Sequence, residues 1–200
     1  PQKLKDCTLA AEIILSAVQA RNRIAIFADY DVDGGSSAAL LFDFLAHFSI
    51  TPTLYVPDRI EEGYGPNPKA MRTLAAEHDL IICVDCGTLA HDALGAATAA
   101  NVIVLDHHLG SETLPTAKAV VNPNRQDETG DLAHLCAAAV VFMVLIEAAR
   151  LMRSTDQTPP NLINSLDLVA LATVADVAPL IGVNRAFVRQ GLKIMGQRKR

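Results

Sequence analysis

The chain has 200 residues, of which half are apolar and a fifth are charged, and its formal net charge is −5. This composition is typical of a folded globular protein, and the negative charge argues against a protein that coats DNA with a broad basic face. No apolar run approaches the length of about 18 residues that a transmembrane helix needs, so we expect no membrane contact.

The cysteines predict the cellular compartment of the protein, and the chain ends suggest whether the sequence is a fragment. Cys7, Cys83, Cys86 and Cys136 show no disulfide-like spacing, which predicts free thiols in a cytoplasmic protein. Cys83 and Cys86 form a lone C-x-x-C pair whose side chains would point to opposite faces of a strand, so we expect buried thiols rather than zinc ligands. The absence of a signal peptide and of an initiator Met suggests a fragment of a longer protein.

The first half of the chain alternates predicted helices and strands. An amphipathic helix over 8–21, with Thr8 as its N-cap, precedes an apolar strand over 24–28. After an Asp-rich loop, a helix is predicted to start at Ser36 or Ser37 and to end near Phe48. The later predictions are a strand at 53–56, a loop at 57–68, a helix capped by Asn67 that runs from Pro68 to Glu77, a strand at 79–84, a helix at 89–100, and strands at 102–105 and 119–121.

This pattern predicts an α/β fold with a five-stranded, mostly parallel sheet and helices on both faces. Residues 135–152, 162–175 and 185–195 read as helices, so a helical C-terminal segment is expected to follow. We expect one domain over 1–200, made of an α/β core over 1–134 and a helical segment over 135–200 that leads to a C-terminal domain outside this sequence.

Three alternating carboxylates follow the first strand directly: Asp29, Asp31 and Asp33. Two such charges about 4 Å apart repel by roughly 4 kcal/mol at an effective dielectric of about 20, so the loop needs cations. An EF-hand loop is disfavoured, because a strand precedes it and Leu40 stands where that loop needs Glu. An aspartyl-phosphate enzyme is also disfavoured, because such a site needs Thr two residues after the second Asp, and Asp33 stands there.

Polar residues also follow the other strands. Asp85 ends the strand at 79–84, Asp106-His107-His108 ends the strand at 102–105, and Asp176 lies near the end of an apolar helix. Parallel sheets bind ligands at the carboxyl ends of their strands, so the residues that follow the strands are expected to form one site. Asp176, in an otherwise apolar run, is expected to need a partner or a metal. Oxygen-rich ligation with one or two imidazoles favours two Mn²⁺ or Mg²⁺ ions, the arrangement used for phosphoryl displacement.

Five motifs in this order resemble the DHH phosphoesterases, and specifically the N-terminal catalytic region of the RecJ family of single-strand-specific exonucleases. The motifs are Asp-Tyr-Asp-Val-Asp-Gly-Gly-Ser-Ser (29–37), Val-Asp-Cys-Gly (84–87), Leu-Asp-His-His-Leu (105–109), Val-Asn-Pro-Asn-Arg (121–125) and Thr-Val-Ala-Asp-Val-Ala-Pro-Leu (173–180). Gly63-Tyr64-Gly65 and residues 135–142 also match, so the resemblance covers nearly the whole chain.

The resemblance implies a metal-dependent 5′→3′ exonuclease that acts on single-stranded DNA in repair and recombination, with single-strand-binding protein and other repair proteins as possible partners. It also implies roles for individual residues. Asp31, Asp33, Asp85, His107 and Asp176 would be metal ligands, with Asp85 bridging two ions, and Asp29 would be a ligand or lie just behind one. His108 would contact the scissile phosphate, Asp106 would orient the imidazoles, and Ser36, Ser37, Asn122, Asn124 and Arg125 would face the substrate.

Two positions depart from the family pattern. Phe27 stands where some relatives carry a ligating His, so one ligand is expected to be missing. Ala137, Ala138 and Ala139 replace glycines whose backbone amides would approach the nucleic acid, so we expect weaker strand binding. The family's DHH-associated domain and OB-fold are absent from these 200 residues, which predicts poor DNA degradation by the fragment alone.

Two other functions compete with the exonuclease. The first is a DHH-family phosphoesterase for small substrates, such as an oligonucleotide hydrolase or an inorganic pyrophosphatase. The second is a non-catalytic DNA-binding relative, which would have lost its metal ligands. The motifs at 29–37 and 173–180 and the intact ligand set favour the exonuclease.

Overall fold

The computed structural model describes residues 1–198 and contains one sheet of five parallel strands in the order β2-β1-β3-β4-β5. The strands are β1 (Ile24–Ala28), β2 (Thr53–Tyr55), β3 (Leu80–Val84), β4 (Asn101–Leu105) and β5 (Ala119–Val121). In the central register, Ile26 of β1 lies opposite Ile82 of β3, which lies opposite Ile103 of β4. The predicted parallel sheet is confirmed.

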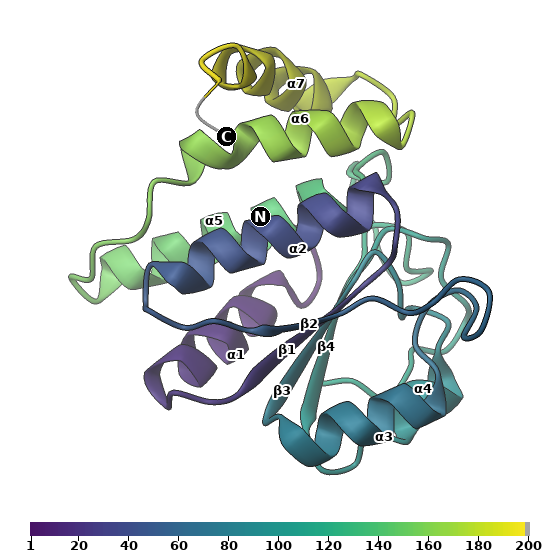
Figure 1. The fold of residues 1–200 in the computed structure, drawn as a ribbon. Coiled ribbons are helices and arrows are strands. Elements are labelled where there is room, and N and C mark those ends of the chain that lie inside the picture. The colour runs from purple at the N-terminus through teal and green to yellow at the C-terminus, as the bar shows by residue number, and fades with distance from the viewer. Residues whose placement is uncertain (199–200) are drawn as a thin grey trace.

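Helices cover both faces of this sheet, as predicted (Figure 1). Helices α1 (Cys7–Gln19), α2 (Val32–Ala46) and α5 (Ala137–Ser154) lie on one face, and α3 (Pro68–Glu77) and α4 (His91–Gly95) lie on the other. Side chains alternate along β1, so Ile24 and Ile26 join the first hydrophobic cluster while Ala25 and Phe27 join the second. Because both faces are buried, the strands read as continuous apolar runs.

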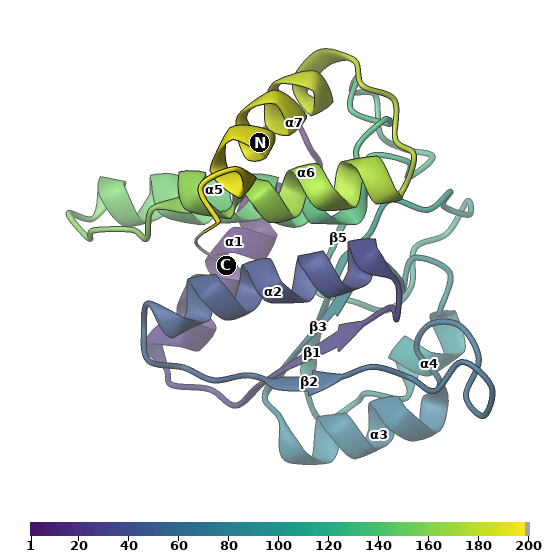
Figure 2. The same ribbon diagram turned by 45° about the horizontal axis from the view of Figure 1, so that its top comes forward.

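A second layer of helices lies outside α2 and α5 (Figure 2). It consists of a 3₁₀ turn (Leu162–Ser165), α6 (Leu166–Ala175) and α7 (Gly182–Met195). Gly191 of α7 lies so close to α6 that a Cβ atom there would be 2.1 Å from the carbonyl oxygen of Leu166. This close approach fixes α7 on α6. Of the helices in residues 1–198, none has an apolar stretch long enough to cross a bilayer.

Two predicted helix starts are wrong. Thr8 does not cap α1, which begins at Cys7; its hydroxyl instead donates a 2.9 Å hydrogen bond to Glu147 on α5. Helix α2 begins at Val32, not at Ser36 or Ser37, because the carboxylate of Asp31 accepts a hydrogen bond from the N–H of Gly34 and acts as the N-cap. Asp33 therefore lies in the first turn of a helix and not in a loop.

Other boundaries differ in smaller ways. The helix predicted at 89–100 contains only His91–Gly95, because the chain turns at Ala96 to bring Asn101 beside Leu80 in the sheet. Asn67 caps α3 and Pro68 begins it, as predicted. The helix predicted at 162–175 begins with the 3₁₀ turn, and α7 begins at Gly182 rather than at Arg185.

Cys83 and Cys86 lie on the same side of the sheet, which corrects the predicted opposite orientation. Asp85 between them has a φ of 60°, so the chain leaves the strand after Val84 and both thiols enter the second hydrophobic cluster. All four cysteines are free and buried.

Candidate metal centre

The polar clusters meet at the carboxyl edge of the sheet, between β1 and the strands beside it. β1 lies between β2 and β3, so the strand order reverses there, and such a switch point is where parallel sheets bind ligands. Asp29 follows β1, Asp85 follows β3, and Asp106 to His108 follow β4. Asp176, the residue after α6, reaches the same place from the outer layer of helices.

The loop after β1 is shaped by a close backbone approach. Gly34 lies so near Asp29 that a Cβ atom would be 2.4 Å from the Asp29 carbonyl oxygen, so only glycine fits. Gly35 has no such neighbour within 4 Å. The packing leaves Asp29 and Asp33 buried, while Asp31 is exposed at the helix N-terminus.

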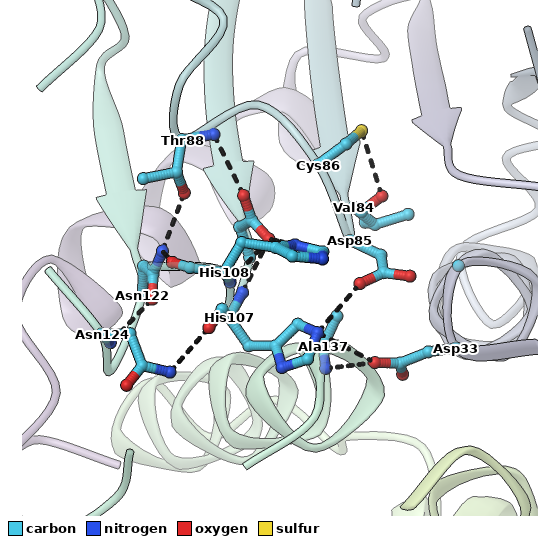
Figure 3. A network of polar contacts seen from close by, with 12 residues as sticks. Asp33, Val84, Asp85, Cys86, Thr88, His107, His108, Asn122, Asn124 and Ala137 are labelled. Carbon is cyan, nitrogen blue, oxygen red and sulfur yellow. Dashed lines mark hydrogen bonds and ion pairs between the residues drawn. The ribbon is translucent and has the colours of Figure 1, made fainter. Parts of the chain in front are cut away.

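Asp33 is held by the N-terminus of α5. Its two carboxylate oxygens accept hydrogen bonds of 2.6 and 2.8 Å from the backbone N–H groups of Ala137 and Ala138 (Figure 3). These amides therefore face a carboxylate of the protein and not the solvent, which corrects the expectation that they lie along a nucleic acid. The sequence predicted a helix starting near residue 135, but nothing in it indicated this partner.

The imidazole of His107 lies among three carboxylates. Its Nε2 atom is 3.3 Å from Oδ1 of Asp85 and 3.8 Å from Oδ2 of Asp33, and its Nδ1 atom is 3.9 Å from Oδ2 of Asp176. The structure thus brings together residues that are up to 143 positions apart in the chain (Asp33 and Asp176).

Asp106 organises the histidine pair. Its Oδ1 atom accepts hydrogen bonds from the backbone N–H groups of His107 (2.7 Å) and His108 (3.2 Å) and lies 2.8 Å from Nδ1 of His108. Its Oδ2 atom accepts the N–H of Thr88 at 3.0 Å. With Nδ1 held in this way, Nε2 of His108 lies 3.3 Å from the hydroxyl of Tyr64. Thr88 had no sequence signal and was not predicted.

Asn122 and Asn124 brace the histidine loop from behind (Figure 3). The Asn122 side chain donates to the carbonyl of His108 and to the hydroxyl of Thr88, both at 2.8 Å. The Asn124 side chain donates to the carbonyl of His107 at 2.6 Å. The side-chain N–H groups of both asparagines therefore bond to protein atoms that support His107 and His108.

The other predicted substrate contacts lie elsewhere. The guanidinium of Arg125 is bonded to Asp6, Asp127 and the carbonyl of Val120, so the structure does not bring it to the cluster. Ser36 and Ser37 lie on the buried side of α2, and Ser37 is completely enclosed.

Phe27, where a ligand was expected to be missing, is fully buried. It stacks on Tyr55 with ring centroids 5.2 Å apart and packs in the second hydrophobic cluster. Phe27 therefore contributes packing below the cluster and no donor atom.

The pKa values of the clustered groups reflect burial, hydrogen bonds and neighbouring charges. Burial raises the pKa of Asp85 to about 8, and burial also raises that of Asp33. Burial alone would lower the pKa of His107, but the hydrogen bond to Asp85 and the charge of Asp33 outweigh it and raise the pKa to about 9. Burial opposes ionisation of Asp106 as well, yet its hydrogen bonds to His108 and Thr88 lower the pKa to about 2.

The donor atoms suit divalent cations. Oδ1 of Asp29 is buried without a hydrogen-bond partner, and the buried Oδ1 of Asp85 faces only Nε2 of His107, at 3.3 Å, a costly state for carboxylates unless a cation binds them. Oxygen donors with imidazole nitrogens are the set that Mn²⁺ accepts and that Mg²⁺ tolerates. Three groups have donor atoms within 4.8 Å of one another: Asp29, Asp31 and Asp85; Asp85, His107 and His108; and Asp33, His107 and Asp176.

Tyr64 closes the opposite side of the site. Its hydroxyl donates to the carbonyl of Asp85 at 3.1 Å and lies 3.2 Å from Nδ1 of His108. Beside it is a cavity of about 330 Å³, also lined by Gly65, Gly87 and Leu89. The Gly63-Tyr64-Gly65 segment was matched in sequence, but no role was predicted for Tyr64.

Comparison with known proteins identifies related folds. Residues 23–173 match the N-terminal domain of the DHH family. The single-stranded-DNA-specific exonuclease RecJ of Dickeya dadantii is 38% identical over 199 residues, which cover 94% of this chain and 34% of that protein. RecJ of Escherichia coli is 36% identical over 201 aligned residues, covering 96% of this chain and 35% of the relative. The chain thus spans about a third of the length of these curated relatives.

Solved structures agree with this match. A crystal structure of exonuclease RecJ bound to manganese superposes with a TM-score of 0.83 at 34% identity, over 95% of this chain and 48% of that one.

Proposed function

Since the chain belongs to the DHH family, we propose that it is the catalytic region of a metal-dependent exonuclease of the RecJ type, which degrades single-stranded DNA in the 5′→3′ direction during repair and recombination. One observation carries this proposal. Three sets of metal-ligand atoms overlap at the carboxyl edge of a parallel sheet, with Asp85 in two sets and His107 in two, in a chain similar to a manganese-bound exonuclease. Sharing of this kind suits two neighbouring cations rather than one.

The proposed cofactor is a pair of Mn²⁺ or Mg²⁺ ions. When bound, they supply Lewis-acid chemistry, because they lower the pKa of a water molecule and neutralise charge on the phosphate. Asp85 would bridge the two ions, since its carboxylate belongs to two of the three groups. The remaining proposed ligands are Asp29, Asp31, Asp33, His107 and Asp176.

The side chains beside the ligands would handle the substrate. His108 is partly exposed, and Asp106 fixes its ring through Nδ1, so we assign it the contact with the scissile phosphate. Asn122 and Asn124 would act indirectly, because they hold the carbonyls of His107 and His108. Hydrolysis adds the water oxygen to phosphorus, and the bond between phosphorus and the leaving sugar oxygen breaks.

The wider setting also remains a proposal. The four buried, unpaired cysteines support a reducing, cytoplasmic location. Single-strand-binding protein and other repair proteins are proposed partners. The division into a core over 1–134 and a helical segment over 135–200 is proposed from the sequence, although α5 packs in the same hydrophobic cluster as α1 and the sheet.

Digestion of a single-stranded oligonucleotide with a 5′ label tests the function. We expect release of labelled mononucleotide from single strands with Mn²⁺, no release with a chelator, and no release from a blunt duplex. The assay should be run on this chain and on a full-length protein that contains it. The variant Arg72→Gln, on the surface of α3, serves as the active control.

Assays with small substrates distinguish the exonuclease from the main alternative, a phosphoesterase for small substrates. A phosphoesterase for small substrates would hydrolyse pyrophosphate or a dinucleotide and leave long single strands intact. That result, obtained with the full-length protein, would overturn the exonuclease proposal.

A further inference from the structure

The positive charge of the chain is concentrated behind Asp176. Residues 177–200 contain six of the 17 Lys and Arg residues and none of the 22 Asp and Glu residues. Such segregation in a chain with a net charge of −5 indicates a local anion-binding surface. Most of this segment is helix α7 (Gly182–Met195).

Three of these cations form a stripe along α7. Arg185, Arg189 and Lys193 recur every fourth residue, so they lie on one side of the helix at intervals of about 6 Å. All three are exposed. The buried side of the helix is a different one, and it is formed by Asn184, Val188 and Gly191.

No acidic partner neutralises the stripe. Within residues 1–198, the side chains of Arg185, Arg189 and Lys193 form neither an ion pair nor a hydrogen bond. By contrast, Arg23 and Arg125 are each paired with Asp. Unpaired, regularly spaced cations are what a phosphate backbone requires.

The stripe begins beside the metal centre. Asp176 directly follows α6, and only five residues separate it from the start of α7 at Gly182. Figure 2 shows that this connection lies at the end of the outer layer where the loops of the carboxyl edge gather, and that α7 runs away from it. From Arg185 to Lys193 the stripe covers about 12 Å along the helix axis.

The helix is also held rigidly. Gly191 lies against the backbone of Leu166, and Phe187 packs edge-on against Phe142 with centroids 5.4 Å apart. A fixed row of charges restricts the path of a bound strand, whereas flexible surface cations do not.

We propose that Arg185, Arg189 and Lys193 form a phosphate track that holds the part of a DNA single strand beyond the scissile bond. This inference rests on the proposed exonuclease function and adds a binding surface to it. The stripe carries no exposed aromatic side chain, so it would contact backbone phosphates without reading the bases. An anionic membrane is the competing partner, because Leu192 and Met195 of the same helix are exposed, and vesicle binding is therefore measured alongside DNA binding.

The variant R185Q/R189Q/K193Q tests the track. The control R72Q/K118Q/R153Q removes the same charge from exposed, unpaired positions on α3, before β5 and at the end of α5. Binding of a fluorescent thymidine 30-mer is measured without divalent metal at several salt concentrations. For three lost phosphate contacts, the slope of log affinity against log salt should fall by about 2 in the track variant and stay unchanged in the control.

Hydrolysis provides a second readout. The track variant should lose kcat/KM on the 30-mer and keep wild-type kcat/KM on a dinucleotide, which is too short to reach α7. An unchanged salt slope, or failure of the wild-type chain to bind the 30-mer, would overturn the track. Binding to phosphatidylserine vesicles is measured in parallel. If the track variant loses vesicle binding but keeps binding of the 30-mer, the track is also overturned. Absence of Mn²⁺-dependent hydrolysis by the full-length protein, with normal binding, would instead refute the exonuclease function and leave the track in place.

Discussion

The backbone N–H of Ala137 donates a 2.6 Å hydrogen bond to Oδ2 of Asp33, a residue 104 positions earlier in the chain. The N–H of Ala138 reaches the other oxygen of the same carboxylate. The N-terminus of an 18-residue helix therefore holds a proposed metal ligand in place, and its dipole favours the charged form of that ligand.

Removing the amide hydrogen of Ala137 should therefore weaken metal binding. Ala137 is the first residue of α5, where proline is compatible with the helix, and Cys136 before it already has an extended conformation. In Ala137→Pro the ring displaces the Asp33 carboxylate, and we expect Mn²⁺ affinity to fall by roughly 10- to 100-fold, as for other residues that orient ligands. Titration calorimetry measures this. Ala137→Gly, which keeps the N–H, should bind like the wild type, and equal affinity of the proline variant would contradict the role of the helix.

Asp85→Asn should abolish Mn²⁺-dependent hydrolysis of single-stranded DNA while the fold survives. Asparagine tolerates the left-handed backbone that Asp85 adopts, whereas alanine adds strain of about 1 kcal/mol there. Asn is thus the cleaner substitution, and Asp85→Ala should lose activity as well as some stability. Circular dichroism and nuclease assays on both variants check this. Residual wild-type rates in Asp85→Asn would rule out the bridging role.

The metal-free protein should lose stability as the pH rises from about 6 to about 9. The folded-state pKa is raised to about 8 for Asp85 and to about 9 for His107, so the folded chain binds more protons than the unfolded chain in this range. Both contributions are present at low pH and are lost as the pH passes the folded values. Thermal melts in a chelator measure the trend.

Added Mn²⁺ should reverse that trend. Metal ligands bind as deprotonated groups, so the stabilisation by Mn²⁺ should grow with pH over the same interval. A stabilisation by Mn²⁺ that does not change between pH 6 and pH 8 would argue against Asp85 and His107 as ligands.

Asp106→Asn should slow hydrolysis without removing the metals. Asp106 accepts hydrogen bonds from His107, His108 and Thr88, and an amide cannot accept from all of them. His108 would lose its fixed orientation toward the phosphate, so we expect kcat to fall by about 10²- to 10³-fold, the range for losing one group that stabilises charge in the transition state. Calorimetry should show Mn²⁺ affinity closer to the wild type than in Ala137→Pro. A change confined to KM would place Asp106 in substrate binding instead.

The sequence predicted the site best where a polar side chain directly follows a recognisable strand, and the fold best where a capping residue begins a helix. Asp29, Asp85 and Asp106 directly follow apolar runs, so the parallel-sheet rule was enough to predict that they converge. Asn67 and Pro68 set the start of α3 by local capping. The prediction that Asp176 joins His107 rested on the family resemblance. Nothing in the local sequence indicates that the helix before Asp176 would bring it to the edge of the sheet.

The remaining features depend on tertiary contacts that carry no local signal. Backbone amides look alike in any sequence, so the bonds from Ala137 and Ala138 to Asp33 could not be foreseen. Thr8 resembles an N-cap, but its hydroxyl bonds to Glu147, 139 residues away. The left-handed backbone at Asp85, which reorients Cys86, is likewise stabilised by residues distant in the chain.

The spread of the cluster along the sequence has a consequence for how the protein folds. The donor atoms come from segments between Asp29 and Asp176, joined through parallel strand pairs that close long loops. Contacts between residues this far apart in the sequence form late in folding, because the long loops between them must close first at a cost in entropy. A nascent chain that has not yet made α6 lacks Asp176, so the complete set of ligands can appear only near the end of synthesis and folding. The proposed hydrolysis is thereby withheld from partly folded chains.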